Sequence, residues 1–331
     1  MSEKNPFISL KILSTGIALP SCRIDSDEID KKLNRAIGYT EKRFGITCRY
    51  HADYTMDSTQ LAVEALEKAL SEGIDPDSID LLIYASAIPI QMLPYSAAQV
   101  LKKSSLRSGT ASMDINTSCV SFVTALHTAG CLLAAGAYRR IAIVSSELAS
   151  RGIDWEHEES SLIFGDGAAC AIVEKGISES GILAYRSETY PEGSDFCEIR
   201  AGGTRRNPRA GMDEKDFLFQ MQGKPLFRLA ASLMEVFLNR LLESAGLTLQ
   251  DITTVIPHQA SHLSLEHIRK RLGVAPETVV DIYRKFGNQV SASVPTALHE
   301  AVTTGRWEPN RPVLLLGTAA GLTLTGMILL P

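Results

Sequence analysis

The sequence predicts an α/β protein made of two similar halves, residues 1–176 and 177–331. Short apolar runs typical of buried strands alternate with amphipathic segments of helical length. The same order of elements occurs twice, because four segments of the first half match four of the second: 81–87 with 254–260, 112–122 with 279–294, 139–147 with 311–319, and 168–176 with 322–330. This repetition indicates a duplicated unit whose inner strands are mostly parallel.

In the first half, apolar runs predict strands and periodic segments predict helices. Asp25 or Ser26 can cap a helix at 27–33. Gly165, Asp166 and Gly167 together are typical of a turn before a strand, so Asp166 is interpreted as a turn residue. The expected strands are 7–17, 81–86, 113–115, 140–146 and 168–174, and the other helices are 58–71, 95–104 and the segment after Cys119.

The second half begins with residues 187–223, which are rich in Gly, Pro, Arg and acidic side chains. We expect an irregular region there, of the kind that often lines a substrate entrance. Beyond it the helical pattern returns and alternates again with strand-like runs. The expected helices are 226–247, 263–272 and 293–302, and the expected strands are 253–257, 278–282 and two more at the C-terminus.

The composition is that of a soluble globular enzyme. The 331 residues are 45% hydrophobic and 21% charged, with a formal net charge of −5 that gives no sign of nucleic-acid or anionic-membrane binding. Six irregularly spaced cysteines indicate free thiols in a reducing, cytoplasmic compartment rather than disulfides or a metal site. We expect no signal peptide, because residues 1–10 lack an apolar core. Residues 313–331 are uncharged, but their glycines and threonines favour two strands over a membrane helix.

Cys119 occupies the most informative position in the chain. It follows a short strand at 113–115, which we expect to be buried, and the polar turn 116–118, and it precedes an apolar helix. The backbone N–H groups and dipole of a helix N-terminus lower the pKa of a nearby thiol, so a reactive thiolate is predicted here. Free cysteines are also common as small core residues, so position alone leaves both interpretations open.

Two further polar residues lie at strand ends that the duplication would bring towards Cys119. His258 follows the strand at 253–257, and Asn288 lies in the turn that corresponds to the Cys119 turn. A cysteine with a distant histidine and asparagine is a known nucleophilic arrangement. A histidine after a strand is also often purely structural, and the spacing does not decide between these interpretations.

Five motifs together resemble the β-ketoacyl-acyl-carrier-protein synthase III family of the thiolase fold: NTSCVSF, FGDGAA, VIPHQA, FGNQVSASVP and GTAAGLTLTG. The resemblance implies a duplicated five-layer αβαβα sandwich and a homodimer. It implies that Cys119 accepts an acyl group from a thioester, and that His258 and Asn288 promote decarboxylation of a malonyl thioester. Backbone N–H groups of Cys119 and Gly321 would form the oxyanion hole. The implied partners are acyl carrier protein and acyl-CoA or acyl-carrier substrates, with no metal or other cofactor.

Substrate-binding positions follow from the same resemblance. Family members commonly place a tryptophan and an arginine on the two sides of the coenzyme A adenine. This chain has Tyr39 and Glu158 there and retains Arg43, which predicts poor use of acyl-CoA because a carboxylate repels phosphates. Leu93 corresponds to a residue that reaches across the dimer into the acyl pocket. Basic residues expected to meet a phosphate or an acidic carrier are Arg205, Arg206, Arg209, Arg228, Arg269 and Lys270.

Several alternatives stay open at this stage. An acyltransferase of the same fold that acylates an oxygen or nitrogen nucleophile would retain Cys119 and His258 without needing Asn288. A papain-like hydrolase also uses Cys, His and Asn, but a whole α/β half precedes Cys119 here. A non-catalytic subunit of a heterodimeric synthase would usually have lost the cysteine. Thiolase-like and hydroxymethylglutaryl-CoA-synthase-like relatives fit less well, because the chain is short for either and lacks a second catalytic cysteine near its C-terminus.

Overall fold

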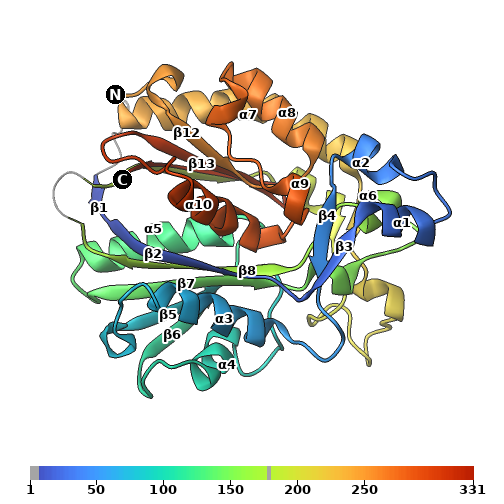
Figure 1. Cartoon of the computed structure of the whole chain (residues 1–331), viewed down its shortest axis with the longest axis horizontal. Helices are drawn as coiled ribbons and strands as arrows, with labels where there is room; N and C mark the ends of the chain where they lie inside the picture. The colour runs from blue at the N-terminus through green and yellow to red at the C-terminus, as the bar shows by residue number, and fades with distance from the viewer. Residues whose placement is uncertain (1–6, 177–179) are drawn as a thin grey trace.

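The computed structural model describes residues 7–176 and 180–331, and these form five layers (Figure 1). The expected αβαβα sandwich is confirmed. Two sheets enclose a middle helical layer, and each sheet is covered on its outer face by helices. The middle layer is α5 (Ser121–Ala134) and α10 (Ser293–Thr303), and the outer layers are α3 (Ser58–Leu70) with α4 (Ser96–Lys103), and α7 (Gly223–Ala245) with α8 (His262–Leu272).

Each half of the chain supplies most of one sheet. The first sheet has the order β2 (Lys11–Ala18), β8 (Gly167–Glu174), β7 (Arg140–Glu147), β5 (Leu81–Ala85) and β6 (Ala111–Ile115). The second has the order β1 (Ile8–Ser9), β9 (Gly181–Thr189), β14 (Thr323–Leu330), β13 (Val313–Ala319) and β12 (Thr254–Pro257). Strands β2, β8, β7 and β5 therefore correspond in order to β9, β14, β13 and β12, as a duplicated unit requires.

The expectation of mostly parallel inner strands is wrong. Among the strands of residues 7–176 and 180–331, only β6–β5, β5–β7 and β12–β13 pair in parallel, whereas β7–β8, β2–β8, β13–β14 and β9–β14 are antiparallel. The turn at 320–322 explains the β13–β14 case, because so short a connection can join only antiparallel neighbours. The sequence does not distinguish the two arrangements, because parallel and antiparallel strands that helices cover on both faces have similar hydrophobic runs.

Four predictions also need correction. The run at 7–17 is two strands, because the chain leaves one sheet as β1 and enters the other as β2. Residues 181–189 form β9, so the irregular region is shorter than expected. Residues 278–282 contribute a single bridge, between Val279 and Val255, after a turn at Pro276–Thr278. β6 is half-exposed rather than buried, because it is the edge strand of its sheet.

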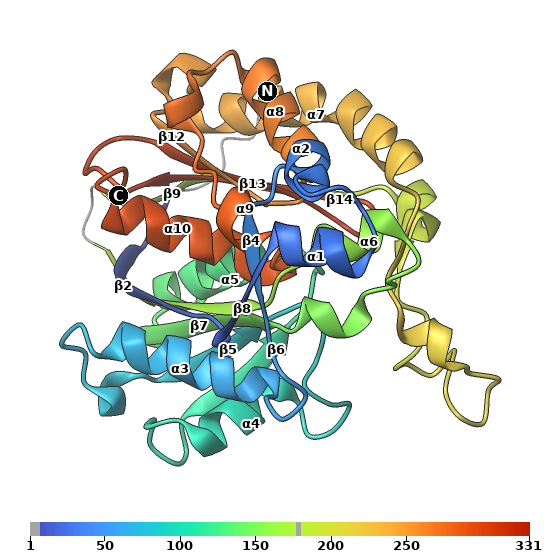
Figure 2. The same cartoon turned by 45° about the vertical axis from the view of Figure 1, so that its right-hand side comes forward.

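Smaller elements gather at one end of the two sheets, on the right of Figure 1. The segment between β10 and β11, yellow in Figure 2, projects away from the body. These elements are β3 (Cys22–Asp25), β4 (Cys48–His51), β10 (Cys197–Glu198), β11 (Gln220–Met221), α1 (Ser26–Lys32), α2 (Tyr39–Phe44), α6 (Glu158–Ser161) and α9 (Tyr283–Phe286). Single turns of 3-10 helix also occur at Pro76–Ser78, Ala149–Gly152, Pro191–Phe196, Glu214–Phe217, Leu249–Asp251 and Val290–Ala292.

Two sequence expectations bear on the chain ends and the division into halves. The expectation of no signal peptide concerns the N-terminus, where residues 1–6 lie outside the described residues. The expected boundary between the halves, at 176/177, lies at the edge of the described residues. The uncharged 313–331 segment forms the antiparallel pair β13 and β14. Within the part of the chain that the structure describes, no helix is long and apolar enough to span a membrane.

Backbone atoms of the two halves meet directly where Gly165 faces the Asn288 turn. The N–H of Gly165 donates to Asn288 O at 3.1 Å, and the N–H of Asn288 donates to Ile163 O at 2.7 Å. A Cβ on Gly165 would lie 2.0 Å from Phe286 O, so only glycine permits this approach. The interpretation of Asp166 as a turn residue alone is incomplete, because its carboxylate accepts from Ala52 N, Ser150 N and Ser150 Oγ.

We predict that Gly165→Ala lowers the free energy of unfolding by about 2 kcal/mol or more, because the new methyl group would overlap a backbone carbonyl that cannot move alone. Urea denaturation measures this change. Gly203→Ala is the matched control, because a Cβ there meets no atom within 4 Å. Equal stability of the two variants would contradict the close approach.

Candidate active site

The turn before Cys119 is held by Asn116. The side chain of Asn116 accepts the N–H of Ser118 at 2.9 Å and donates to Ala87 O at 2.8 Å, which ties the ends of β6 and β5 together. Ser118 has a left-handed backbone conformation with φ 57°, unusual for a residue other than glycine. The chain therefore reverses sharply, and Cys119 emerges just before α5 begins at Ser121.

The Asn288 turn repeats this arrangement in the second half. Asn288 accepts the N–H of Val290 at 2.8 Å and donates to Ala260 O at 3.3 Å, and Val290 has φ 50°. Because its Oδ1 is occupied by an N–H, the amide of Asn288 is oriented with Nδ2 as a donor. One N–H of Nδ2 bonds Ala260, and the other remains for a ligand. The expected correspondence between the two turns is confirmed.

His258 follows β12 and is buried, with 4% of its surface exposed. Its backbone N–H donates to Leu316 O at 2.7 Å, which fixes it beside β13. Burial lowers the pKa of the imidazole to about 4, so the ring is neutral at physiological pH. Its Nδ1 lies 2.6 Å from Ser293 Oγ.

The Cys119 and His258 segments meet at the end of β13. A Cβ on Gly317 would lie 2.6 Å from Val120 Cγ1 and 3.4 Å from His258 Cβ, so the two residues pack on this glycine. The 320–322 turn follows, where Gly321 has φ 117°. Asn288 reaches the same place through Ala260, whose N–H bonds His258 O at 3.0 Å. The segments that carry Cys119, His258, Asn288 and Gly321 therefore adjoin one another at the end of β13.

The expectation that Cys119 has a lowered pKa is wrong. Burial raises the pKa of its thiol to about 11, and hydrogen bonds from Ser118 and the backbone of Ala320 offset only part of that rise. Ser118 Oγ lies 3.9 Å from the sulfur. The helix terminus therefore does not outweigh removal of the thiolate from water, and Cys119 is a protonated thiol at neutral pH.

The predicted substrate residues on α2 and α6 do come together. The Tyr39 hydroxyl donates to Glu158 at 2.9 Å, and Arg43 Nε lies 3.9 Å from the same carboxylate. Arg35, which sequence reasoning missed, also pairs with Glu158. The charge of Glu158 is thus offset by two arginines, and its predicted repulsion of phosphates is weaker than the sequence alone indicated.

The other predicted substrate residues lie apart from this cluster. Arg205, Arg206 and Arg209 lie on the projecting 199–219 segment (Figure 2), where Arg206 donates to Gly211 O at 2.7 Å. Arg269 is not available to a carrier, because it pairs with Glu266 and Asp281. Arg228 on α7 and Lys270 on α8 are exposed, and Leu93 is 83% exposed on the loop after β5.

Glu147 is a buried residue that the sequence analysis did not identify. It lies at the end of β7 and is 1% exposed. Its Oε1 accepts the N–H of Ala87 at 2.6 Å and the hydroxyl of Ser291. Burial raises the pKa of its carboxyl to about 7, which those hydrogen bonds oppose. The contact fixes the turn after Asn288 to the loop that carries Leu93.

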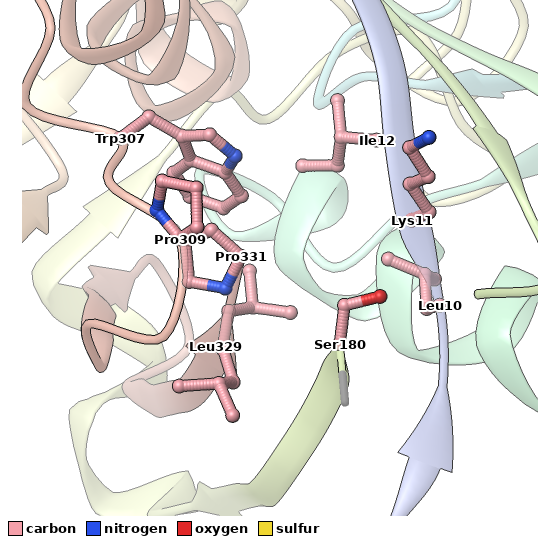
Figure 3. A pocket seen from close by; sticks show the side chains of 9 residues that line it. Leu10, Lys11, Ile12, Ser180, Trp307, Pro309, Leu329 and Pro331 are labelled. Atoms are coloured by element: carbon pink, nitrogen blue, oxygen red, sulfur yellow. The ribbon is translucent and has the colours of Figure 1, made fainter. Parts of the chain in front are cut away.

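A pocket of about 200 Å³ lies elsewhere, between β2, Trp307 and the end of β14 (Figure 3). Leu10, Ile12, Leu329 and two prolines make it mostly apolar, and none of Cys119, His258 and Asn288 lines it. It is therefore separate from the site described above. Among the described residues, no group of three or more His, Cys, Asp or Glu side chains is placed to hold a metal ion.

The duplicated five-layer fold defines an acyltransferase of the thiolase class. Two family models match the chain: 3-oxoacyl-[acyl-carrier-protein] synthase III over residues 113–191 and the C-terminal part of the same synthase over 242–330. Together they span just over half of it. The chain belongs to the 3-oxoacyl-[acyl-carrier-protein] synthase III family and is a condensing enzyme, so the papain-like alternative is wrong.

Individual relatives agree with this assignment over nearly the whole chain. The β-ketoacyl-[acyl-carrier-protein] synthase III of Clostridium perfringens is 28% identical, covering 95% of this chain and 96% of that protein. The Aquifex aeolicus 3-oxoacyl-[acyl-carrier-protein] synthase III structure has a TM-score of 0.87 at 28% identity, covering 97% and 100%. The Thermus thermophilus synthase III structure has a TM-score of 0.87 at 29% identity, covering 96% and 98%.

We predict that alkylation of Cys119 by iodoacetamide accelerates about tenfold per pH unit between pH 7 and 9, because the reactive thiolate fraction rises by that factor below a pKa of about 11. Peptide mapping by mass spectrometry follows Cys119 separately from the other cysteines. A rate that levels off below pH 8 would mean that the helix terminus does activate the thiol.

Proposed function

We propose that the protein transfers an acyl group from a thioester to Cys119 and condenses it with a malonyl thioester. The main support is the Asn288 turn, whose amide is oriented as a donor and tied through Ala260 to His258. An acyltransferase that only passes the acyl group to an oxygen or nitrogen has no use for that donor. The proposal covers fatty-acid initiation and specialised fatty-acid or polyketide pathways, since both use these half-reactions.

The first half-reaction forms an acyl-enzyme. The sulfur of Cys119 attacks the donor carbonyl, the bond to the donor sulfur breaks, and the Cys119 proton ends on the departing thiol. Splitting the transfer in this way replaces one difficult step by two easier ones. The backbone N–H groups of Cys119 and Gly321 stabilise the oxyanion. The conformation of the 320–322 turn supports this role. Gly321 has φ 117°, a backbone conformation that residues with a side chain rarely adopt, so glycine is needed to orient this backbone.

The second half-reaction makes the carbon–carbon bond. Loss of CO2 from the malonyl thioester leaves an enolate, whose oxygen accepts from His258 Nε2–H and Asn288 Nδ2–H. Because His258 is neutral, its ring has a single N–H, which this step requires on Nε2. The enolate carbon then attacks the acyl-Cys119 carbonyl, and the Cys119 sulfur leaves and recovers a proton. No metal or redox cofactor takes part in this sequence.

We predict that Asn288→Ala leaves acylation of Cys119 nearly unchanged and slows condensation about a hundredfold, roughly 3 kcal/mol, the scale of one lost oxyanion donor. Intact-protein mass spectrometry after mixing with acyl thioesters measures the first step, and β-ketoacyl product formation measures the second. Cys119→Ser is the control that should show no acyl mass gain. Unchanged condensation in Asn288→Ala would remove Asn288 from the proposed site.

We further propose that the acyl donor is bound to acyl carrier protein rather than to free coenzyme A. Arg35, which pairs with Glu158, lies over the Tyr39 ring with its Cζ 5.3 Å from the ring centroid, so an adenine could stack on that face only by displacing Arg35. A carrier has no adenine and is unaffected. Exposed Arg228 and Lys270 give a basic surface that suits an acidic carrier.

We predict that kcat/KM is higher for the carrier-bound donor than for the matching acyl-CoA, by about tenfold, and that Glu158→Arg narrows the difference by improving the CoA reaction. The substitution removes the carboxylate and leaves Arg35 and Arg43 free for phosphates. Single-turnover acylation with both donors measures this. If wild type uses both donors equally and Glu158→Arg changes neither rate, the donor proposal is wrong.

A homodimer is part of the proposed active form. The edge strand β6 has a neighbour on one side only, β5. In the adjoining 88–95 loop, Met92 is 64% exposed and Leu93 is 83% exposed. Exposure of two consecutive apolar side chains is unfavourable and is typical of an interaction surface. Pairing of two β6 edges would cover both features, and Leu93 would then line the partner's acyl pocket.

A further inference from the structure

Ser293 is the only polar contact of His258 Nδ1 among residues 7–176 and 180–331. Ser293 is fully buried at the start of α10. Its Oγ lies 2.6 Å from Nδ1 and 2.8 Å from Val290 O, and the N–H of Gln259 approaches it at 3.4 Å. A hydroxyl has one proton to donate, so Nδ1 and Val290 O compete for it.

The first half of the molecule has a serine equivalent to Ser293 but no histidine equivalent to His258. Ser121 begins α5 as Ser293 begins α10, and its Oγ donates to Ser118 O at 2.6 Å. The residue at the position of His258 is Ala85, because segment 81–87 matches 254–260. The hydroxyl in the first half therefore only closes a turn, whereas in the second half it also contacts an imidazole.

Two observations decide which acceptor takes the Ser293 proton. The separation of 2.6 Å lies below the usual range of an N–H···O bond and within that of a bond donated by a hydroxyl. Val290 O already accepts the backbone N–H of Ser293, so it is not left unsatisfied if the hydroxyl turns away. The hydroxyl proton therefore points to Nδ1, and the ring proton is on Nε2.

We propose that Ser293 is a positioning residue that fixes His258 as the Nε2–H tautomer. This inference rests on the proposed function for its consequence: only that tautomer presents an N–H to the enolate oxygen of the malonyl thioester. A carbonyl or carboxylate in place of Ser293 would accept from Nδ1 and leave Nε2 without a proton. Ser293 thus serves decarboxylation and has no part in acylation of Cys119.

Ser293→Ala tests this assignment by separating the two half-reactions. Without the hydroxyl the ring populates both tautomers, so decarboxylation of the malonyl thioester should fall about tenfold while acylation of Cys119 changes less than about twofold. Ser293→Thr retains the hydroxyl and should restore decarboxylation. Thr296→Val is the matched control, because it removes a buried hydroxyl of α10 that donates only to Ala292 O. An equal loss in both half-reactions of Ser293→Ala would mean that Ser293 serves packing alone.

Nitrogen-15 NMR of histidine-labelled protein reads the tautomer directly and needs no activity. Wild type should show the Nε2–H pattern for His258, identified with a His258→Ala variant, and Ser293→Ala should shift it toward a mixture. An Nδ1–H pattern in wild type, or no change in Ser293→Ala, would overturn the inference. If Ser293→Ala does not fold, the wild-type spectrum and Ser293→Cys decide it. Failure of acyl thioesters to label Cys119 would overturn the proposed function instead and leave the NMR result valid.

Discussion

The site depends on the backbone contact between Gly165 and the Asn288 turn. Two hydrogen bonds cross between the halves there, and Gly165 and Gly287 have no room for a side chain. Gln289 adds a third link, donating to Asp166 O at 3.2 Å. Because Asn288 is fixed by the first half and Cys119 belongs to that half, this backbone contact sets the position of the Asn288 turn relative to the Cys119 turn.

Burial controls the chemistry of the site more than any charge does. It keeps His258 neutral and Cys119 protonated at rest. A neutral imidazole has two tautomers, and we propose that the hydroxyl proton of Ser293 selects the one that carries its proton on Nε2. In the proposed reaction, burial of His258 would also strengthen the hydrogen bond that it gives to a developing oxyanion.

Much of this arrangement was predictable from sequence, and the failures have physical causes. The repeated order of elements placed Cys119, His258 and Asn288 at strand ends, and the structure confirms that their segments converge. The antiparallel ladders were missed because strands covered on both faces have no distinguishing periodicity. Arg35 and Glu147 were missed because their partners lie 123 and 144 residues away and no local pattern marks such contacts. The pKa of Cys119 was predicted in the wrong direction because desolvation depends on the packed structure.

The separation of β1 from β2 has a consequence for how the chain folds. Ile8 and Ser9 pair with Ile182 and Gly181 in the sheet of the second half, while the next strand enters the first. One hydrophobic core includes Leu10, Leu126, Ile256 and Leu315, drawn from both halves. β1, from the first half, therefore completes the sheet of the second half, and the middle core is shared by both halves. Although the molecule is built from two copies of one unit, it should unfold in a single cooperative transition, and a chain cut between the copies should not yield two independently stable products.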